Sequence, residues 1–439
     1  MHILLCVSFS RWIRRDLVIN RTRMKQIRYL IFILLFCVFP ARVLIHWVPF
    51  LGYPKMATGL VLVEYVCILM LIARSYGDKN LPKKDKQYKL LYVLFWIYNL
   101  YIIYYVMINP VMPREDMAQA PRSNFSFIQA AITTSLEIAV VVNYQHFLNV
   151  KLFTKMAAAF MTAVLIAYTL MSDMSMYLYE KTLSGYELNK FDISEYGLID
   201  TLTMSEFVQM AFILNFFARE SWTKNEGLNK LIFWTASLPL LAMLLIYGQR
   251  GPVLWLAMSI LFYYYSKGKL GKILFISIVT IVLIGVLWGD AIMSMFSKYD
   301  ITLLERFLNI GDDGGSGRFG SEDSVYGSSF HQIMSGLLFG SNFRLTMGEY
   351  IGTYPHNFIL EFLMTFGLVF TLPLICLICK GMKISYYAIR QNEGMSLFCL
   401  LFINTYAYHL TSYTVVNDTK MWILLAMVLC IKPVMVRKL

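Results

Sequence analysis

The stretch NFILEFLMTFGLVFTLPLICLIC, residues 357–379, contains a single charged side chain, that of Glu361. A helix of about 20 apolar residues crosses a hydrocarbon core about 30 Å thick. Inside that core each backbone N–H and C=O group needs a partner within the protein, and a helix supplies these partners. The stretch therefore predicts a membrane-spanning α-helix.

Similar apolar runs recur along the whole chain of 439 residues, of which 58% are hydrophobic and 15% charged. Soluble domains are about half apolar and a quarter charged. The sequence therefore predicts an all-α fold, with residues 1–439 forming one polytopic membrane domain, a bundle of about 12 transmembrane helices. The expected spans are 27–49, 56–74, 90–112, 127–148, 156–173, 197–218, 230–248, 252–266, 273–289, 357–379, 396–413 and 420–436.

The net charge of +12 reports the orientation of these spans. Basic residues gather in the connections on one side, and short basic loops stay in the cytoplasm. Both termini are therefore expected in the cytoplasm, and no nucleic-acid partner is expected. The basic segments are 11–28, 74–89, 151–155, 219–230, 267–272, 380–390 and 432–438.

The seven cysteines lie in or beside apolar stretches, so we expect no disulfide framework. Cys376 and Cys379 form a CxxC pair within an apolar run, with neither a second pair nor a histidine nearby. We expect this pair to pack in the core.

The opposite side receives one long hydrophilic segment, residues 290–355. Within it, residues 301–310 have the apolar spacing of a short amphipathic helix, and the glycine-rich run 311–320 follows. Residues 330–339 are apolar but too short to cross, so we expect them at the interface or dipping into it. The segment is predicted to be a periplasmic loop that covers a membrane-embedded site.

Arg250 lies in the sequence YGQRGP, residues 247–252, between two apolar runs. Pro252 suits the first turn of a helix, so Arg250 is expected at an outward-facing helix N-terminus. Free N–H groups and a guanidinium at that point suit a phosphate group. The competing interpretation is an arginine that reaches toward lipid headgroups.

His356 lies in the sequence TYPHNF, residues 353–358, where the long segment ends. It is expected to cap the helix that follows, where the helix dipole disfavours a protonated imidazole. A neutral histidine there accepts a proton. From position alone, a polar residue that is merely satisfied at the interface is an equal alternative.

The long segment carries further charged candidates. Arg318, in the glycine-rich run, is expected to act as a second cationic clamp, while Arg306 and Arg344 are less distinctive members of the same loop. Four acidic residues match no calcium-loop spacing, so we interpret them as solvated loop acids and expect no metal site; they are Asp312, Asp313, Glu322 and Asp323.

Glu64 and Glu137 are lone charges inside predicted spans. A charge facing lipid is costly, so both are expected to face the interior of the bundle. The sequence gives neither of them a partner.

Three stretches together resemble the C-terminal signature of the O-antigen polymerase and O-antigen ligase family. In that signature an arginine opens the loop, an apolar segment follows, and an HN-plus-apolar helix ending in glycine closes it. The stretches are GSGRFG (315–320), GLLFGSNF (336–343) and YPHNFILEFLMTFGL (354–368). In addition, YGQRGPVLW (247–255) resembles the family's other arginine motif.

The resemblance implies a GT-C-like glycosyltransferase in the bacterial inner membrane. It would join undecaprenyl-diphosphate-linked oligosaccharide repeat units at the periplasmic face, without a metal or other cofactor. The expected partners are these lipid-linked oligosaccharides and membrane lipids, together with a chain-length regulator and a flippase. The implied roles are a general base for His356, diphosphate binding for Arg250 and Arg318, and support for Asn357, Arg344 and Arg306.

Two alternatives remain beside the polymerase. An O-antigen ligase, with lipid A core as acceptor, needs the same diphosphate site, and only the greater number of polymerases favours the polymerase. A lipid-linked-oligosaccharide flippase or other transporter belongs to a different class. It would place ionisable groups near mid-membrane and keep its outer loops short, whereas the charged candidates here crowd one long loop.

Overall fold

The computed structural model describes most of the predicted spans. Within the described residues the chain consists of helices and the turns between them, without a strand, which confirms the all-α prediction there. The described residues are 24–44, 55–75, 86–108, 124–171, 201–246, 250–274, 324–346, 348, 352, 354–391, 394–411 and 418–431.

A helix over residues 24–38 comes first in the described chain. The elements after it are α3 (Lys55–Ser75), α4 (Lys86–Ile108), α5 (Asn124–Tyr144), η1 (Gln145–Phe147), α6 (Val150–Met171), α9 (Thr201–Ala218), α10 (Glu226–Ile246), α11 (Arg250–Ser266), α15 (Val325–Ser335), α16 (Phe358–Arg390), α17 (Ser396–Tyr408) and α18 (Thr419–Leu429).

Within the described ranges, three helical segments are long and apolar enough to cross a membrane, and they lie in α6, α10 and α16. This is the composition of a helical membrane protein. The total of about 12 spans and the GT-C-like architecture stay predictions. Of the predicted span 273–289, residues 275–289 lie outside the described residues.

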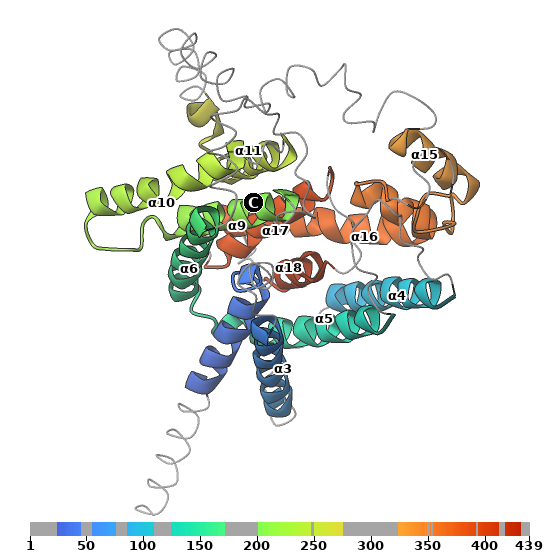
Figure 1. The fold of residues 1–439 in the computed structure, drawn as a ribbon, viewed down its shortest axis with the longest axis horizontal. Helices are drawn as coiled ribbons and strands as arrows, with labels where there is room; N and C mark the ends of the chain where they lie inside the picture. Colours follow the sequence, from blue (N-terminus) through green and yellow to red (C-terminus); the bar gives the residue numbers. More distant parts are fainter. Residues whose placement is uncertain are drawn as a thin grey trace, which may run out of the picture.

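Helix α17 lies at the centre of the bundle (Figure 1). Almost every one of its side chains is buried, including Phe398 and Phe402, and a helix that is apolar all round is expected to be enclosed. The helices packed around it are α9, α11, α16 and α18, and α18 in turn packs on α5.

The outer surfaces of several helices are apolar as well. Leu62, Leu69 and Leu100 on α3 and α4 are each more than half exposed, as is expected for helices that face lipid. None of the six cysteines that the structure describes forms a disulfide. Cys376 and Cys379 are exposed on α16, so the expectation that they pack in the core is wrong.

Helix α16 is interrupted at Gly367, whose backbone (φ 65°, ψ −166°) is not helical. The loop after α15, residues 336–341, fills the interruption: Leu368 N–H donates to Leu337 O (2.9 Å) and Ser341 N–H donates to Met364 O (2.8 Å). Residues 330–339 therefore form the end of α15 and part of this loop. Whether they lie at a membrane interface stays a prediction, as does the lid, because residues 301–323 lie outside the described residues.

Candidate functional site

The start of α16 is fixed to the end of α17. Asn357 is the N-cap of α16, and its side-chain oxygen accepts hydrogen bonds from Ile359 N–H (2.9 Å) and Leu360 N–H (3.2 Å). Its side-chain amide donates to Leu410 O (3.0 Å), and Phe358 N–H donates to His409 O (2.9 Å). One asparagine therefore both begins the helix and ties it to its neighbour.

His356 precedes this cap and does not itself cap the helix, which corrects the prediction from sequence. Its backbone has φ 52°, in the left-handed region that few non-glycine residues adopt, although histidine is among those that do so more often. The half-buried imidazole lies against the ring of Tyr354, with 4.4 Å between ring centroids. His356 therefore lies one residue before the cap, in a turn that holds its ring against Tyr354.

The start of α11 reaches the same end of α17. As predicted, Arg250 begins the helix and Pro252 lies in its first turn. Trp255 Nε1–H donates to Thr411 Oγ1 (2.8 Å), next to the residues that hold Asn357 and Phe358. Five residues of helix separate Arg250 from Trp255, about 7–8 Å along the axis. The side chain of Arg250 itself lies outside what the structure describes.

The connection between α17 and α18 holds a buried ion pair. His409 Nε2 lies 2.8 Å from Asp418 Oδ2, and His409 Nδ1 donates to Thr405 O at 2.8 Å. A carbonyl oxygen and a carboxylate only accept, so the contact with Asp418 is an ion pair when the imidazole is protonated. Both ring nitrogens face acceptors within the protein, so His409 is placed to hold α17 and α18 together and not to take a proton from a substrate.

Asp418 is the N-cap of α18 and accepts from Met421 N–H (3.2 Å). Burial opposes its negative charge, but Lys420 and His409 outweigh burial and hold the pKa of this carboxyl well below its usual range. Lys420 Nζ also pairs with Glu206 Oε1 of α9 at 2.5 Å. A chain of alternating charges thus runs from α17 through α18 to α9.

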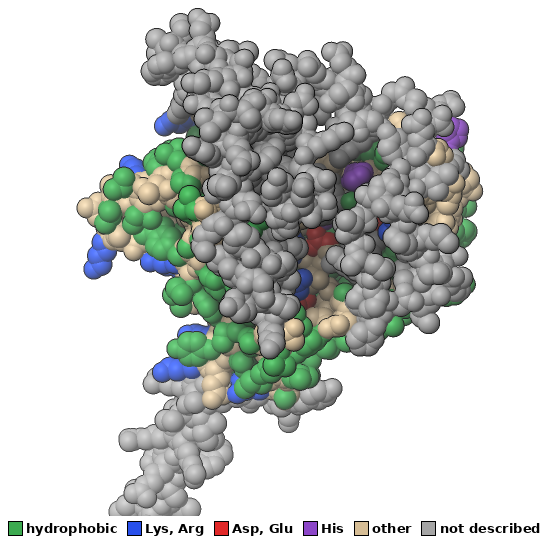
Figure 2. All heavy atoms as spheres, in the orientation of Figure 1, with side chains coloured by type: hydrophobic (Ala, Val, Ile, Leu, Met, Phe, Trp, Pro, Cys, Tyr) green, Lys and Arg blue, Asp and Glu red, His purple; other side chains and the backbone are tan. Residues whose placement is uncertain are grey.

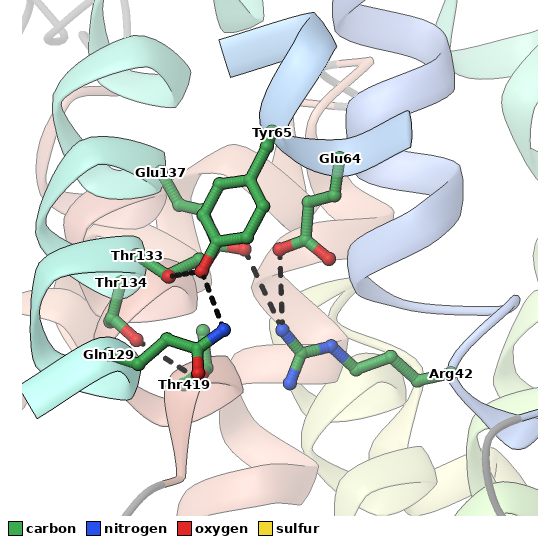
Figure 3. Close-up of polar contacts among 8 residues, drawn as sticks. All are labelled: Arg42, Glu64, Tyr65, Gln129, Thr133, Thr134, Glu137 and Thr419. Carbon is green, nitrogen blue, oxygen red and sulfur yellow. Dashed lines mark hydrogen bonds and ion pairs between the residues drawn. The ribbon is translucent and has the colours of Figure 1, made fainter. Parts of the chain in front are cut away.

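Glu64 and Glu137 face the interior, as predicted, and the structure supplies the partner that sequence lacked. Arg42 Nη2 lies 3.5 Å from Glu64 Oε1 and 3.6 Å from Glu137 Oε1, at a junction of the first helix with α3 and α5 (Figure 3). The hydroxyl of Thr134 on α5 donates to Thr419 Oγ1 (3.1 Å), which joins this group to α18.

Figure 2 shows acidic, basic and histidine side chains near one another on this face of the molecule. Buried charges inside a helical membrane bundle commonly mark a path or binding site for a polar ligand. This charged cluster, with the starts of α11 and α16, is the candidate functional site.

Of the three other arginines predicted for the site, the structure describes only Arg344. Arg344 donates from Nη1 to Gly352 O (2.6 Å) and lies over the Phe343 ring, so it braces the loop that leads to His356. Arg318 and Arg306 lie outside the described residues. Sequence reasoning missed the five residues whose charges need a distant partner to be recognised: Arg42, Glu206, His409, Asp418 and Lys420.

Replacement of Asn357 tests how the start of α16 is held. Asn357→Ala removes the cap and the tie to Leu410, so we expect a loss of about 1–2 kcal/mol in stability. Asn357→Ser keeps a capping oxygen but cannot reach Leu410, so its loss is expected to be smaller. Melting temperatures of the purified variants in detergent measure both. An alanine variant as stable as the wild type would contradict this role.

No protein-family model, curated protein or solved structure matches the chain.

Proposed function

We propose that the chain is a polysaccharide polymerase of the bacterial inner membrane that joins undecaprenyl-diphosphate-linked oligosaccharide repeat units at the periplasmic face. The donor is a growing chain on the lipid diphosphate, and the acceptor is the next lipid-linked repeat unit. His356 acts as general base, and Arg250 and Arg318 bind the diphosphate, as the resemblance implies. Asn357, Arg344 and Arg306 support these groups.

The reaction needs few protein groups. An acceptor hydroxyl oxygen attacks the anomeric carbon of the donor sugar while the bond from that carbon to the diphosphate oxygen breaks. His356 takes the hydroxyl proton, and undecaprenyl diphosphate leaves with the bonding electrons. The arginines stabilise the negative charge that develops on the leaving group, and direct displacement inverts the anomeric centre.

The convergence of two helix starts on one turn supports this proposal. Phe358, two residues after His356, donates its backbone N–H to the carbonyl oxygen of His409. Trp255, five residues after Arg250, donates its indole N–H to the hydroxyl of Thr411. The two family-like motifs, about a hundred residues apart in sequence, thus begin helices that meet within residues 409–411. A general base and a diphosphate clamp need such proximity to act on one substrate.

Buried ion pairs favour a second candidate, a transporter of lipid-linked sugars. Arg42, Glu206 and Lys420 lie inside the bundle, where transporters keep charged groups. The long loop and the two motifs favour the polymerase. An O-antigen ligase remains the alternative within the same chemistry, since it differs in its acceptor.

The test is reconstitution of the purified full chain in vesicles with its native lipid-linked repeat unit and a chelator. A ladder of lengthened products from the repeat unit alone supports the polymerase. Product that forms only after lipid A core is added indicates a ligase. Transfer of unlengthened lipid-linked sugar between leaflets indicates a transporter and contradicts the proposal.

A further inference from the structure

Arg42, Glu64 and Glu137 form a buried group, here called the Arg42 triad, that the proposed polymerase reaction does not use. Arg42 lies in the turn after the first helix, and the two glutamates lie on α3 and α5. Glu137 is completely buried, Glu64 is 4% exposed and Arg42 is 27% exposed. Figure 3 shows the guanidinium directed between the two carboxyl groups.

The contacts within the triad are unequal. Arg42 donates a hydrogen bond to Glu64, whereas its 3.6 Å separation from Glu137 is an ion-pair distance only. Neither carboxyl oxygen of Glu137 accepts a hydrogen bond from the residues that the structure describes. Glu64 is therefore the bonded partner of Arg42, and Glu137 is directed into the group without a donor of its own.

The charges of the triad do not balance. With both glutamates ionised, one guanidinium faces two carboxylates, which leaves one uncompensated negative charge. The effective penalty for burying such a charge is several kcal/mol, and a buried carboxyl in this position takes up a proton instead.

The described parts of the surrounding elements supply no second free cation. Lys420 of α18 is engaged by Glu206 of α9, and the hydroxyl of Tyr92 on α4 pairs with Ser135. The other titratable groups near the triad on the described elements are Cys37 and Lys420, which interact electrostatically with Arg42, and Cys67, which interacts with Glu64. The hydroxyl of Tyr65 on α3 pairs with Thr133 on α5.

A metal cation would need several oxygen ligands, and the nearby hydroxyls are already paired. Thr133 Oγ1 pairs with Tyr65 (2.7 Å), and Thr134 donates to Thr419. No group of three or more metal-ligating side chains occurs in the described part of the chain. A proton needs only one oxygen.

We propose that the Arg42 triad is a proton-binding site, in which Glu137 holds the proton and Glu64 stays ionised against Arg42. Release of the proton leaves an uncompensated negative charge where three helices meet, so proton occupancy and the packing of these helices are coupled. The site is independent of His356 and of the glycosyl transfer proposed above.

Infrared spectroscopy of the purified full chain tests this directly. We expect a band from a protonated carboxylic acid at neutral pH that shifts in D₂O and is lost in Glu137→Gln. Glu226→Gln, which removes an exposed carboxyl paired with Lys230, is the matched control and should keep the band. A band that survives Glu137→Gln overturns the proposal.

Thermal stability gives a second readout. Because glutamine resembles a protonated carboxyl in shape, Glu137→Gln should keep the wild-type melting temperature at neutral pH, whereas Arg42→Met should lower it. A Glu137→Gln variant that unfolds as readily as Arg42→Met contradicts the proposal. A second outcome would also contradict the proposal. If sodium raises the melting temperature of the wild type but choline at equal ionic strength does not, and Glu137→Gln loses this response, the ligand is a metal cation and not a proton.

Discussion

Replacing His356 with asparagine is expected to slow polymer formation by about 10²–10⁴-fold, the usual contribution of a general base. Asparagine suits this position because it tolerates a left-handed backbone, such as the φ of 52° found here, better than alanine does. The loss should therefore come from the missing proton acceptor and not from backbone strain. The measurement is the initial rate of ladder formation in vesicles.

The matched control for this variant is His331→Asn. His331 is exposed on α15 and has no role in the proposed reaction, so its replacement should leave the rate unchanged. Equal melting temperatures of the two variants would show that both are folded. A His356→Asn protein that polymerises at the wild-type rate would remove His356 as the base.

The second large effect is expected at the interruption of α16. A Cβ atom on Gly367 would lie 2.3 Å from the carbonyl carbon of Leu338, and one on Gly340 would lie 2.2 Å from Thr365 O. Both glycines also have positive φ angles, 65° and 77°. We expect either change to alanine to cost about 3 kcal/mol or more, combining left-handed strain with overpacking against backbone that cannot move aside.

Gly59→Ala in α3 provides the control for these glycine variants. A Cβ there meets nothing within 4 Å, so this change should be neutral or stabilise the helix by about 0.5–1 kcal/mol. Melting temperature and monodisperse yield in detergent measure all three variants. If Gly367→Ala behaves like Gly59→Ala, the loop 336–341 does not pack into α16 as described.

Hydropathy predicted where helices lie, because a run of apolar residues has few other stable conformations in lipid. It located their ends less well. The predicted membrane span ends at residue 379, but helix α16 continues to Arg390. Hydropathy marks only the apolar part of a helix, and the basic residues of 380–390 therefore hid its last turns. Likewise, nothing in the sequence shows that residues 336–341 fill the interruption at Gly367, since only folding brings them together.

The candidate site was predictable in part. A proline in the first turn is a local signal, and it marked the start of α11. For α16 the sequence placed the cap on His356, whereas Asn357, the next residue, caps the helix. The charged cluster has no such signal, because its partners are 22 residues apart in Arg42–Glu64 and 214 apart in Glu206–Lys420. Sequence identified Glu64 and Glu137 as costly, but only the packing of helices identified Arg42 as their partner.

In the proposed function, lipid diphosphate is the leaving group of a glycan-lengthening reaction. The most direct measurement counts undecaprenyl diphosphate released against glycosidic bonds formed, in vesicles supplied with the repeat unit and a chelator. The polymerase predicts one lipid diphosphate released for each bond, with release and lengthening lost together in His356→Asn. Lipid-linked sugar that crosses the bilayer with neither release nor lengthening would contradict the account.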